Sequence, residues 1–160
     1  MLSAFYTSLY KWSGEQDLVV GLPAASQPQY DSEALVGHCV NFLPLRIQLD
    51  GQQAFSSLLS NVSNLILDAY EHQNYTYGSL LKKLPIKRDP SRIPLCPVSF
   101  NVDQGIQGSK LDFQGLDVHF HSNPRAYENF EIFINASDYG NQFIIECQYN
   151  TNLFHLFKLI

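Results

Sequence analysis

The sequence carries little charge and no long apolar run. Charged residues make up 16% of its 160 residues, and ten Lys and Arg against fifteen Asp and Glu leave a net charge of -5. Nucleic-acid binding needs a positive stripe that neutralises phosphates, and no block of basic residues supplies one. No apolar run approaches the roughly 18 residues that span a bilayer. The sequence therefore predicts no nucleic-acid partner and no membrane partner.

Cysteine is also scarce, and its spacing excludes two common uses of that residue. The three cysteines, Cys39, Cys96 and Cys147, are widely spaced and form no C-x-x-C pair. Neither a zinc knuckle nor a disulfide framework is therefore predicted. Reduced, mostly buried thiols together with the lack of a secretory leader after Met1 predict a cytoplasmic protein.

The common signatures of a self-sufficient active site are missing as well. The motifs G-x-S-x-G, G-x-G-x-x-G and G-x-x-x-x-G-K-S/T do not occur. His119 and His121 stand two apart in a predicted strand and face one way, but no further ligand stands at a supporting spacing. No metal site is predicted. Adjacent His38 and Cys39 would point to opposite faces of a strand, so they do not make a nucleophile with its base.

What the sequence does contain is a clear mixture of helical and extended patterns, with 45% hydrophobic residues to fill a core. Apolar residues recur at intervals of three and four over 2–12 and 53–72, which predicts two amphipathic helices. The first has no capping residue before it and closes at Ser13-Gly14. A shorter helix is predicted over 77–84, and another after Asn152.

Extended runs lie between these helices. Pro44 interrupts one of them, which indicates an edge strand or a bend. Proline-rich stretches predict loops over 23–32 and 85–97. The predicted strands are 17–22, 39–49 and 98–102, a pair of short strands around Gly115 within 111–121, and a hairpin of 130–136 and 142–149. Because strands and helices do not alternate strictly, the expected fold class is α/β (α+β), a two-layer sandwich with helices on one face of a mixed sheet.

The run from Leu35 to Arg46 places a polar residue where a plain core would not. Asn41 stands among apolar residues, and a buried amide without hydrogen-bond partners costs about 1–3 kcal/mol. Gly37, four residues earlier, lets a backbone or a ligand approach closely. Asn41 therefore either ties down a neighbouring loop or faces a cleft, and the pattern is compatible with both.

A second unusual segment combines His72-Gln73 with the proline-bounded stretch 87–95. In that stretch Arg88 and Arg92 bracket Asp89. Two guanidinium groups near one carboxylate predict a fixed loop or a contact that reaches another lobe. A simple solvated loop is the alternative.

Taken in order, these segments resemble the later core motifs of condensation domains from nonribosomal peptide synthetases. The resemblance covers nearly the whole chain, and residues 1–160 are identified as the C-terminal lobe of such a domain, with the N-terminal lobe outside this sequence. The motifs are DLVVGLP at 17–23, VGHCVNFLPLR at 36–46, HQ at 72–73, RDPSRIPL at 88–95 and YNTNLF at 149–154.

The resemblance implies a chloramphenicol-acetyltransferase-like lobe, two of which form a V around a tunnel. Carrier proteins insert phosphopantetheine arms from opposite ends, and the acceptor amine attacks the donor thioester to give an amide. The arms are substrates, and no cofactor is bound directly. The implied partners are the N-terminal lobe of the same domain, upstream and downstream carrier proteins, and an adjacent adenylation domain.

The resemblance also implies roles for individual residues. The family's H-H-x-x-x-D-G signature is absent, so no catalytic residue is expected in this chain, which is predicted to be inactive when isolated. Asn41 is expected near the reaction centre as an auxiliary polar group, with Gly37 and His38 beside it in the substrate and pantetheine tunnel. The residues expected to organise the lobe or its contact with the other lobe are Arg46, Arg88, Asp89 and Arg92.

Two alternatives accompany this interpretation. The Gly-His-Cys-Val-Asn form of the motif, at residues 37–41, is similar to a subtype found in hybrid peptide–polyketide assembly lines. A different class of function is a non-catalytic condensation-like module that recruits carrier proteins or partner domains. In either case an isolated lobe would expose apolar surface that its mate covers, which predicts self-association or marginal stability.

Overall fold

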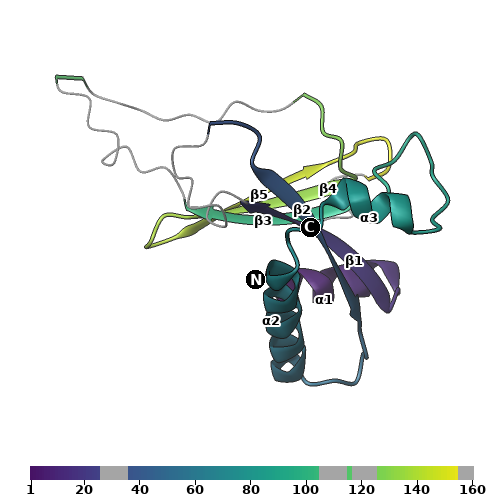
Figure 1. Cartoon of the computed structure of the whole chain (residues 1–160). Helices are drawn as coiled ribbons and strands as arrows, with labels where there is room; N and C mark the ends of the chain where they lie inside the picture. Colours follow the sequence, from purple (N-terminus) through teal and green to yellow (C-terminus); the bar gives the residue numbers. More distant parts are fainter. Residues whose placement is uncertain (26–35, 105–114, 117–125, 155–160) are drawn as a thin grey trace. The chain divides into compact units, whose positions relative to one another are not determined.

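The structure is a computed structural model that describes residues 1–25, 36–104, 115–116 and 126–154 (Figure 1). Contacts divide the chain into two compact units, residues 1–100 and 101–160. The helices are α1 (Leu2–Ser13), α2 (Phe55–Glu71) and α3 (Tyr77–Lys83). The strands are β1 (Asp17–Ala25), β2 (Val40–Gln48), β3 (Val98–Gln104), β4 (Ile132–Asp138) and β5 (Phe143–Tyr149).

The strands form one mixed sheet with the order β2-β1-β3-β4-β5. Strand β1 runs antiparallel to β2 and parallel to β3, and β4 runs antiparallel to β5. The predicted combination of a mixed sheet with helices is therefore confirmed. Strand β2 lies at the edge of this sheet, as Pro44 indicated.

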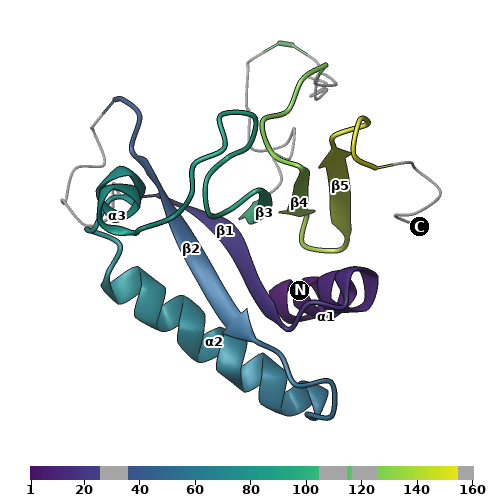
Figure 2. The ribbon, with the colours of Figure 1, turned by 90° about the vertical axis from the view of Figure 1, so that its right-hand side faces the viewer.

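The core of the first unit lies between the β1–β2 pair and the helices α1 and α2, which also contact each other (Figure 2). Val20 faces Leu45 across the two strands, and both are fully buried. Directly opposed residues of an antiparallel pair share one face of the sheet, so this face carries the apolar contacts. The helices contribute the buried residues Leu2, Phe5, Tyr6 and Leu9 from α1 and Leu58 and Val62 from α2.

Helix α1 begins and ends as its sequence predicts. No side chain caps its first turn, and Gly14 ends it in the left-handed region, with φ of 74°. Glycine adopts that conformation without a Cβ clash, and its N–H returns to the Tyr10 carbonyl at 2.8 Å. The hydroxyl of buried Tyr6 donates a 2.7 Å hydrogen bond to the Leu45 carbonyl, which ties α1 to β2.

The pairing of β1 with β2 corrects one prediction. The register runs without interruption from Asp17 opposite Gln48 to Ala25 opposite Val40, so the loop predicted to begin at Pro23 was wrong for residues 23–25. Pro23 lies two residues from Gly21, whose carbonyl accepts a hydrogen bond from Ser99 Oγ on β3 and so points away from β2. The N–H that Pro23 lacks would point the same way, so its loss costs no bond to β2.

In the second unit β4 and β5 form the predicted hairpin, with Asp138 opposite Phe143 at its closed end. Gly140 has φ of 85° in the turn, and its N–H donates to the Asp138 carboxylate at 2.7 Å. Residues 151–153 form a turn and Phe154 is not helical, and the part of the helix predicted after Asn152 that begins at residue 155 lies outside the described residues. Most of the predicted strands around Gly115, with His119 and His121, lies outside them too.

Candidate functional site

The predicted site residues lie in three places in the first unit: at and just before the start of β2, in the loop after α3, and, for Arg46, farther along β2. The H-Q motif ends α2: His72 is its C-terminal cap, and the His72 ring Nδ1 lies 2.8 Å from the Asp68 carbonyl oxygen. Thr76 then caps α3, because its Oγ1 accepts a hydrogen bond from the Ser79 N–H at 3.2 Å. Residues 72–76, named the H-Q connection, therefore join two helices, and α3 contacts β2.

Asn41 is held by this connection through both ends of its amide. Its Nδ2 donates to the Gln73 carbonyl at 2.6 Å and to the Tyr75 carbonyl at 3.4 Å. Its Oδ1 accepts from the N–H of Phe42 at 2.9 Å and of Tyr77 at 3.2 Å. The prediction that Asn41 ties down a neighbouring loop is confirmed, and the four contacts fix which way its amide points.

The segment before β2 is open where it is described. Gly37 and His38 are exposed, and a Cβ added at Gly37 would meet no atom within 4 Å. Cys39 is partly buried and Val40 is 51% exposed. The glycine is therefore not needed for packing among the described residues, which leaves its predicted role beside a substrate as an expectation.

Phe42 and Tyr77 form an aromatic contact next to Asn41. The two rings meet edge to face, with centroids 5.2 Å apart. This arrangement is attractive because the positive edge of one ring lies against the negative face of the other. On β1, Gly21 leaves room for Phe42: a Cβ added there would lie 1.9 Å from Cζ of the Phe42 ring. The glycine of the 17–23 motif is thus needed for this close approach.

Tyr77 also reaches the loop that follows α3. Its hydroxyl donates to the Pro94 carbonyl and lies against buried Cys96. Burial raises the pKa of the Tyr77 hydroxyl well above its ordinary value. Burial likewise raises the pKa of the Cys96 thiol, to about 12. Both groups are therefore protonated at neutral pH.

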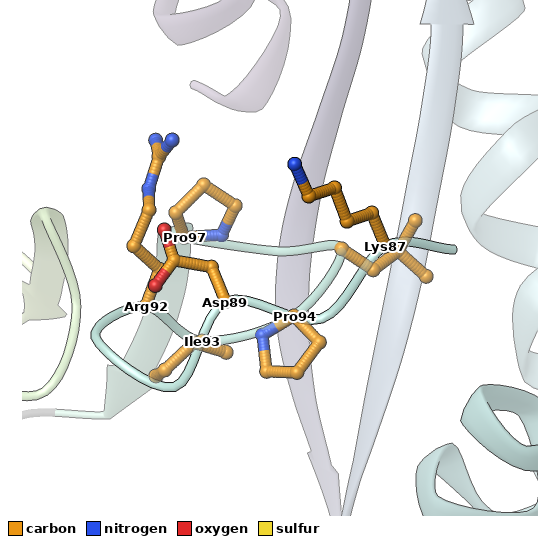
Figure 3. Close-up of a pocket in the computed structure, with 7 residues that line it drawn as sticks. Lys87, Asp89, Arg92, Ile93, Pro94 and Pro97 are labelled. Carbon is orange, nitrogen blue, oxygen red and sulfur yellow. The ribbon is translucent and has the colours of Figure 1, made fainter.

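The loop that contains Arg88 and Asp89, residues 87–97, is named the R-D loop. It has a shallow hollow of about 210 Å³ (Figure 3). Asp89 accepts hydrogen bonds from the N–H and the hydroxyl of Ser91, at 2.9 and 2.6 Å, and these bonds with the nearby Arg92 charge lower the pKa of the carboxyl. Arg88 donates to the Leu81 carbonyl at 3.4 Å. Asp89 thus serves to fold its own loop. The hollow is lined by Lys87, Asp89, Arg92, Ile93, Pro94, Leu95 and Pro97.

Arg46 lies away from this group and pairs with the first residue of β1. Its Nε and Nη2 donate to the two carboxylate oxygens of Asp17 at 2.8 and 2.6 Å. The side chains are 70% and 41% exposed, respectively. The pair joins two sequence motifs across the β1–β2 hairpin, and it lowers the pKa of Asp17 through the hydrogen bonds from Arg46.

Sequence reasoning missed Tyr77 and Phe42, because an aromatic residue in an apolar pattern suggests core packing alone. The order of the residues held one signal: Tyr77 is the first residue of a helix that begins four residues after the H-Q motif.

Across the described parts of the chain, no three His, Cys, Asp or Glu side chains are grouped to hold a metal ion. None of the helices described is long and apolar enough to cross a membrane.

Comparison with known proteins decides the family. The family model described as "Condensation domain" matches residues 1–159. The chain belongs to the condensation-domain family. Curated relatives include a linear gramicidin synthase of Brevibacillus parabrevis, 33% identical over 156 residues, and a surfactin synthase of Bacillus subtilis (strain 168), 32% identical over 154 residues. Each alignment covers 96% of this chain, but only 2% and 4% of those two synthetases.

Solved structures share the fold. A four-domain nonribosomal peptide synthetase in its holo form matches with a TM-score of 0.84 at 22% identity, over 99% of this chain and 13% of that one. The condensation domain of the Monacolin K polyketide synthase matches with a TM-score of 0.80 at 20% identity, over 99% of this chain and 37% of that one. The X-domain from teicoplanin biosynthesis has a TM-score of 0.80 at 15% identity, over 98% of this chain and 36% of that one. This condensation-domain chain therefore has the length of about a third of a solved domain of its fold.

Proposed function

We propose that residues 1–160 are the C-terminal lobe of a condensation domain that joins a donor acyl thioester to an acceptor aminoacyl thioester. Both substrates are carried on phosphopantetheine arms of carrier proteins in the cytoplasm. The amine nitrogen of the acceptor attacks the donor carbonyl carbon, an amide bond forms, and the donor carrier leaves as a free thiol. The arms are substrates of the site and not resident cofactors.

The match of residues 1–159 to the condensation-domain family carries this proposal. Asn41 follows exposed Gly37 and His38 closely in the chain, and its four hydrogen bonds give its amide a fixed orientation, which is compatible with this proposal. In the proposed domain Asn41 is the auxiliary polar group, and Gly37 and His38 line the tunnel. The histidine that acts on the attacking amine would come from the N-terminal lobe.

The proposed partners follow from the same placement. The N-terminal lobe covers part of this chain, carrier proteins deliver the two substrates, and an adenylation domain lies next to the condensation domain. Arg88, Asp89 and Arg92 form a loop that organises the lobe or its contact with the N-terminal lobe. The Arg46–Asp17 pair organises the hairpin that leads to Asn41.

The test is condensation by purified proteins. Donor and acceptor carriers are loaded chemically, and the dipeptidyl-carrier product is followed by intact-protein mass spectrometry. The chain is assayed alone, beside a condensation domain that pairs it with an N-terminal lobe containing H-H-x-x-x-D-G. Product from the paired domain only is the expected result. Product from this chain alone would overturn the assignment of the catalytic histidine to the other lobe.

A recruiting module without chemistry is the second candidate. The observation in its favour is the fold shared with the teicoplanin X-domain, which has also been solved in complex with OxyB and matches this chain with a TM-score of 0.79. In the same experiment, binding of carriers or a partner domain without any amide product, from either protein, would select this function over the enzyme.

A further inference from the structure

Tyr77 contacts two segments that the sequence motifs mark separately, and it directly follows a third in the chain. Its N–H donates to Asn41 Oδ1 at 3.2 Å, its ring lies edge to face against Phe42, and its hydroxyl donates to the Pro94 carbonyl. One residue at the start of α3, directly after the H-Q connection, therefore joins the β2 motif to the R-D loop. All of these residues belong to the first unit.

The carbonyl that receives the Tyr77 hydroxyl is presented by a strained turn. Leu95 has φ of 65°, the only positive φ among the described non-glycine residues. The Cys96 N–H donates to the same Pro94 carbonyl at 2.7 Å, which closes a three-residue turn around Leu95. A leucine stays in this conformation only when surrounding contacts hold it there. The Tyr77 hydroxyl is one such contact.

Core packing accounts only in part for the position of α3. Residues such as Tyr77 and Leu80 are half-buried, but none in this helix is fully buried, whereas α1 and α2 both bury apolar side chains. The place of its first turn therefore also depends on directional contacts, and those contacts converge on Tyr77. Because the Tyr77 N–H is one of two donors to Asn41 Oδ1, a shift of this turn would release one side of the Asn41 amide.

We infer that Tyr77 is a positioning residue of the condensation reaction, which holds the Asn41 amide in its working orientation by bracing α3 against Phe42 and Pro94. This inference rests on the proposed function and on the role of Asn41 in it. Tyr77 itself need not touch the substrate. Its effect on the reaction must therefore pass through Asn41.

A double-mutant cycle tests this dependence in the paired condensation domain described above. Tyr77→Phe removes the hydroxyl, Asn41→Ala removes the amide, and the third variant carries both changes. The expected result is a fall in kcat of about tenfold for Tyr77→Phe, of the size that a barrier change near one hydrogen bond produces. The KM for the loaded acceptor carrier stays unchanged, and Tyr77→Phe has no further effect on kcat when Asn41 is already alanine.

Tyr70→Phe is the matched control. Tyr70 lies on α2 in the same unit, is 40% exposed, and its side chain makes no hydrogen bond among the described residues. It should retain the kcat of the unsubstituted domain. Leu95→Gly serves as a second probe, because glycine relaxes the turn that presents the Pro94 carbonyl. Its loss of kcat should also vanish in the Asn41→Ala background.

The outcomes separate this inference from the proposed function. If the unsubstituted domain forms no amide, the proposed function fails. If that domain is active but the effects of Tyr77→Phe and Asn41→Ala multiply, Tyr77 acts independently of Asn41 and the inference is overturned. The inference is also overturned if Tyr77→Phe changes only KM or leaves kcat unchanged. Should Tyr77→Phe unfold the domain, the Leu95→Gly cycle decides the question by the same criterion.

Discussion

The ring of Phe42 on β2 lies directly over the backbone of Gly21 on β1. A Cβ at Gly21 would lie 1.9–2.7 Å from three atoms of that ring, and the ring is held on another side by Tyr77. Gly21→Ala should therefore push Phe42 out of place and lower the free energy of unfolding by about 1–3 kcal/mol, as overpacking does. Urea denaturation followed by circular dichroism measures this change. An unchanged midpoint would mean that the ring moves aside freely.

Gly37 provides the opposite case within the next motif. Because a Cβ there meets nothing within 4 Å, Gly37→Ala should leave the urea midpoint unchanged. If Gly37 lies beside the pantetheine arm in the paired domain, the same substitution should raise the KM for a loaded carrier several-fold. A lower midpoint together with an unchanged KM would reverse both expectations and assign Gly37 to the fold.

Asn41→Ala should affect both stability and activity. It leaves the Tyr77 N–H and the Gln73 carbonyl without the partners that they have now, in a partly buried site, which costs about 1–3 kcal/mol. The domain should still fold, and condensation should slow. Thermal unfolding and product formation are measured on one preparation of the paired domain. Unchanged turnover would remove Asn41 from the reaction.

The cysteines should differ sharply in reactivity. A maleimide at pH 7 should label exposed Cys147 and partly buried Cys39, and should spare Cys96 until urea unfolds the chain. Since folding raises the pKa of Cys96 from 9.0 to about 12, its contribution to stability is present below pH 9 and is lost as the pH rises toward 12. Peptide mapping measures the labelling. Early labelling of Cys96 would show that the Tyr77–Pro94 region opens readily.

The Arg46–Asp17 pair should matter for stability only weakly at neutral pH, because both side chains are exposed. Arg46 lowers the pKa of Asp17 in the folded chain. The pair therefore stabilises the fold above the ordinary carboxyl pKa of 3.8, and this contribution is lost as the pH falls through the lower folded value. Arg46→Ala should make the free energy of unfolding depend less on pH in the acid range. A large loss of stability at pH 7 would show that the pair also stabilises the fold strongly at neutral pH.

Local pattern predicted most of the helices and strands, and it failed where a distant segment decides the structure. Helix α2, predicted over 53–72, forms over 55–71, because its apolar stripe is long and regular. Pro23 suggested a loop, but pairing with Phe42, far along the chain, keeps it in a strand. A single stretch of sequence does not contain that information.

The candidate site likewise combines contacts that local sequence predicts with contacts between distant segments. The two alternatives for Asn41 could not be separated from sequence, because its partners lie 32–36 residues away. Tyr77 was missed because its partners Asn41 and Pro94 lie 36 and 17 residues away along the chain. The role of Asp89 could be predicted from its neighbours alone, since aspartate commonly accepts a hydrogen bond from the backbone N–H two residues later. Ser91 is that residue here.

Pro44 affects how copies of this chain can associate through the edge of the sheet. It stands opposite Gly21, whose carbonyl points toward β3, so the N–H that Pro44 lacks would have pointed outward from edge strand β2. A strand that paired with β2 from outside would lack one backbone hydrogen bond in the middle of that edge, because Pro44 has no N–H to donate. Growth of a fibril by strand addition to β2 is thereby discouraged. Association of isolated copies should instead use exposed apolar side chains such as Phe55, Leu59 and Leu67 on α2.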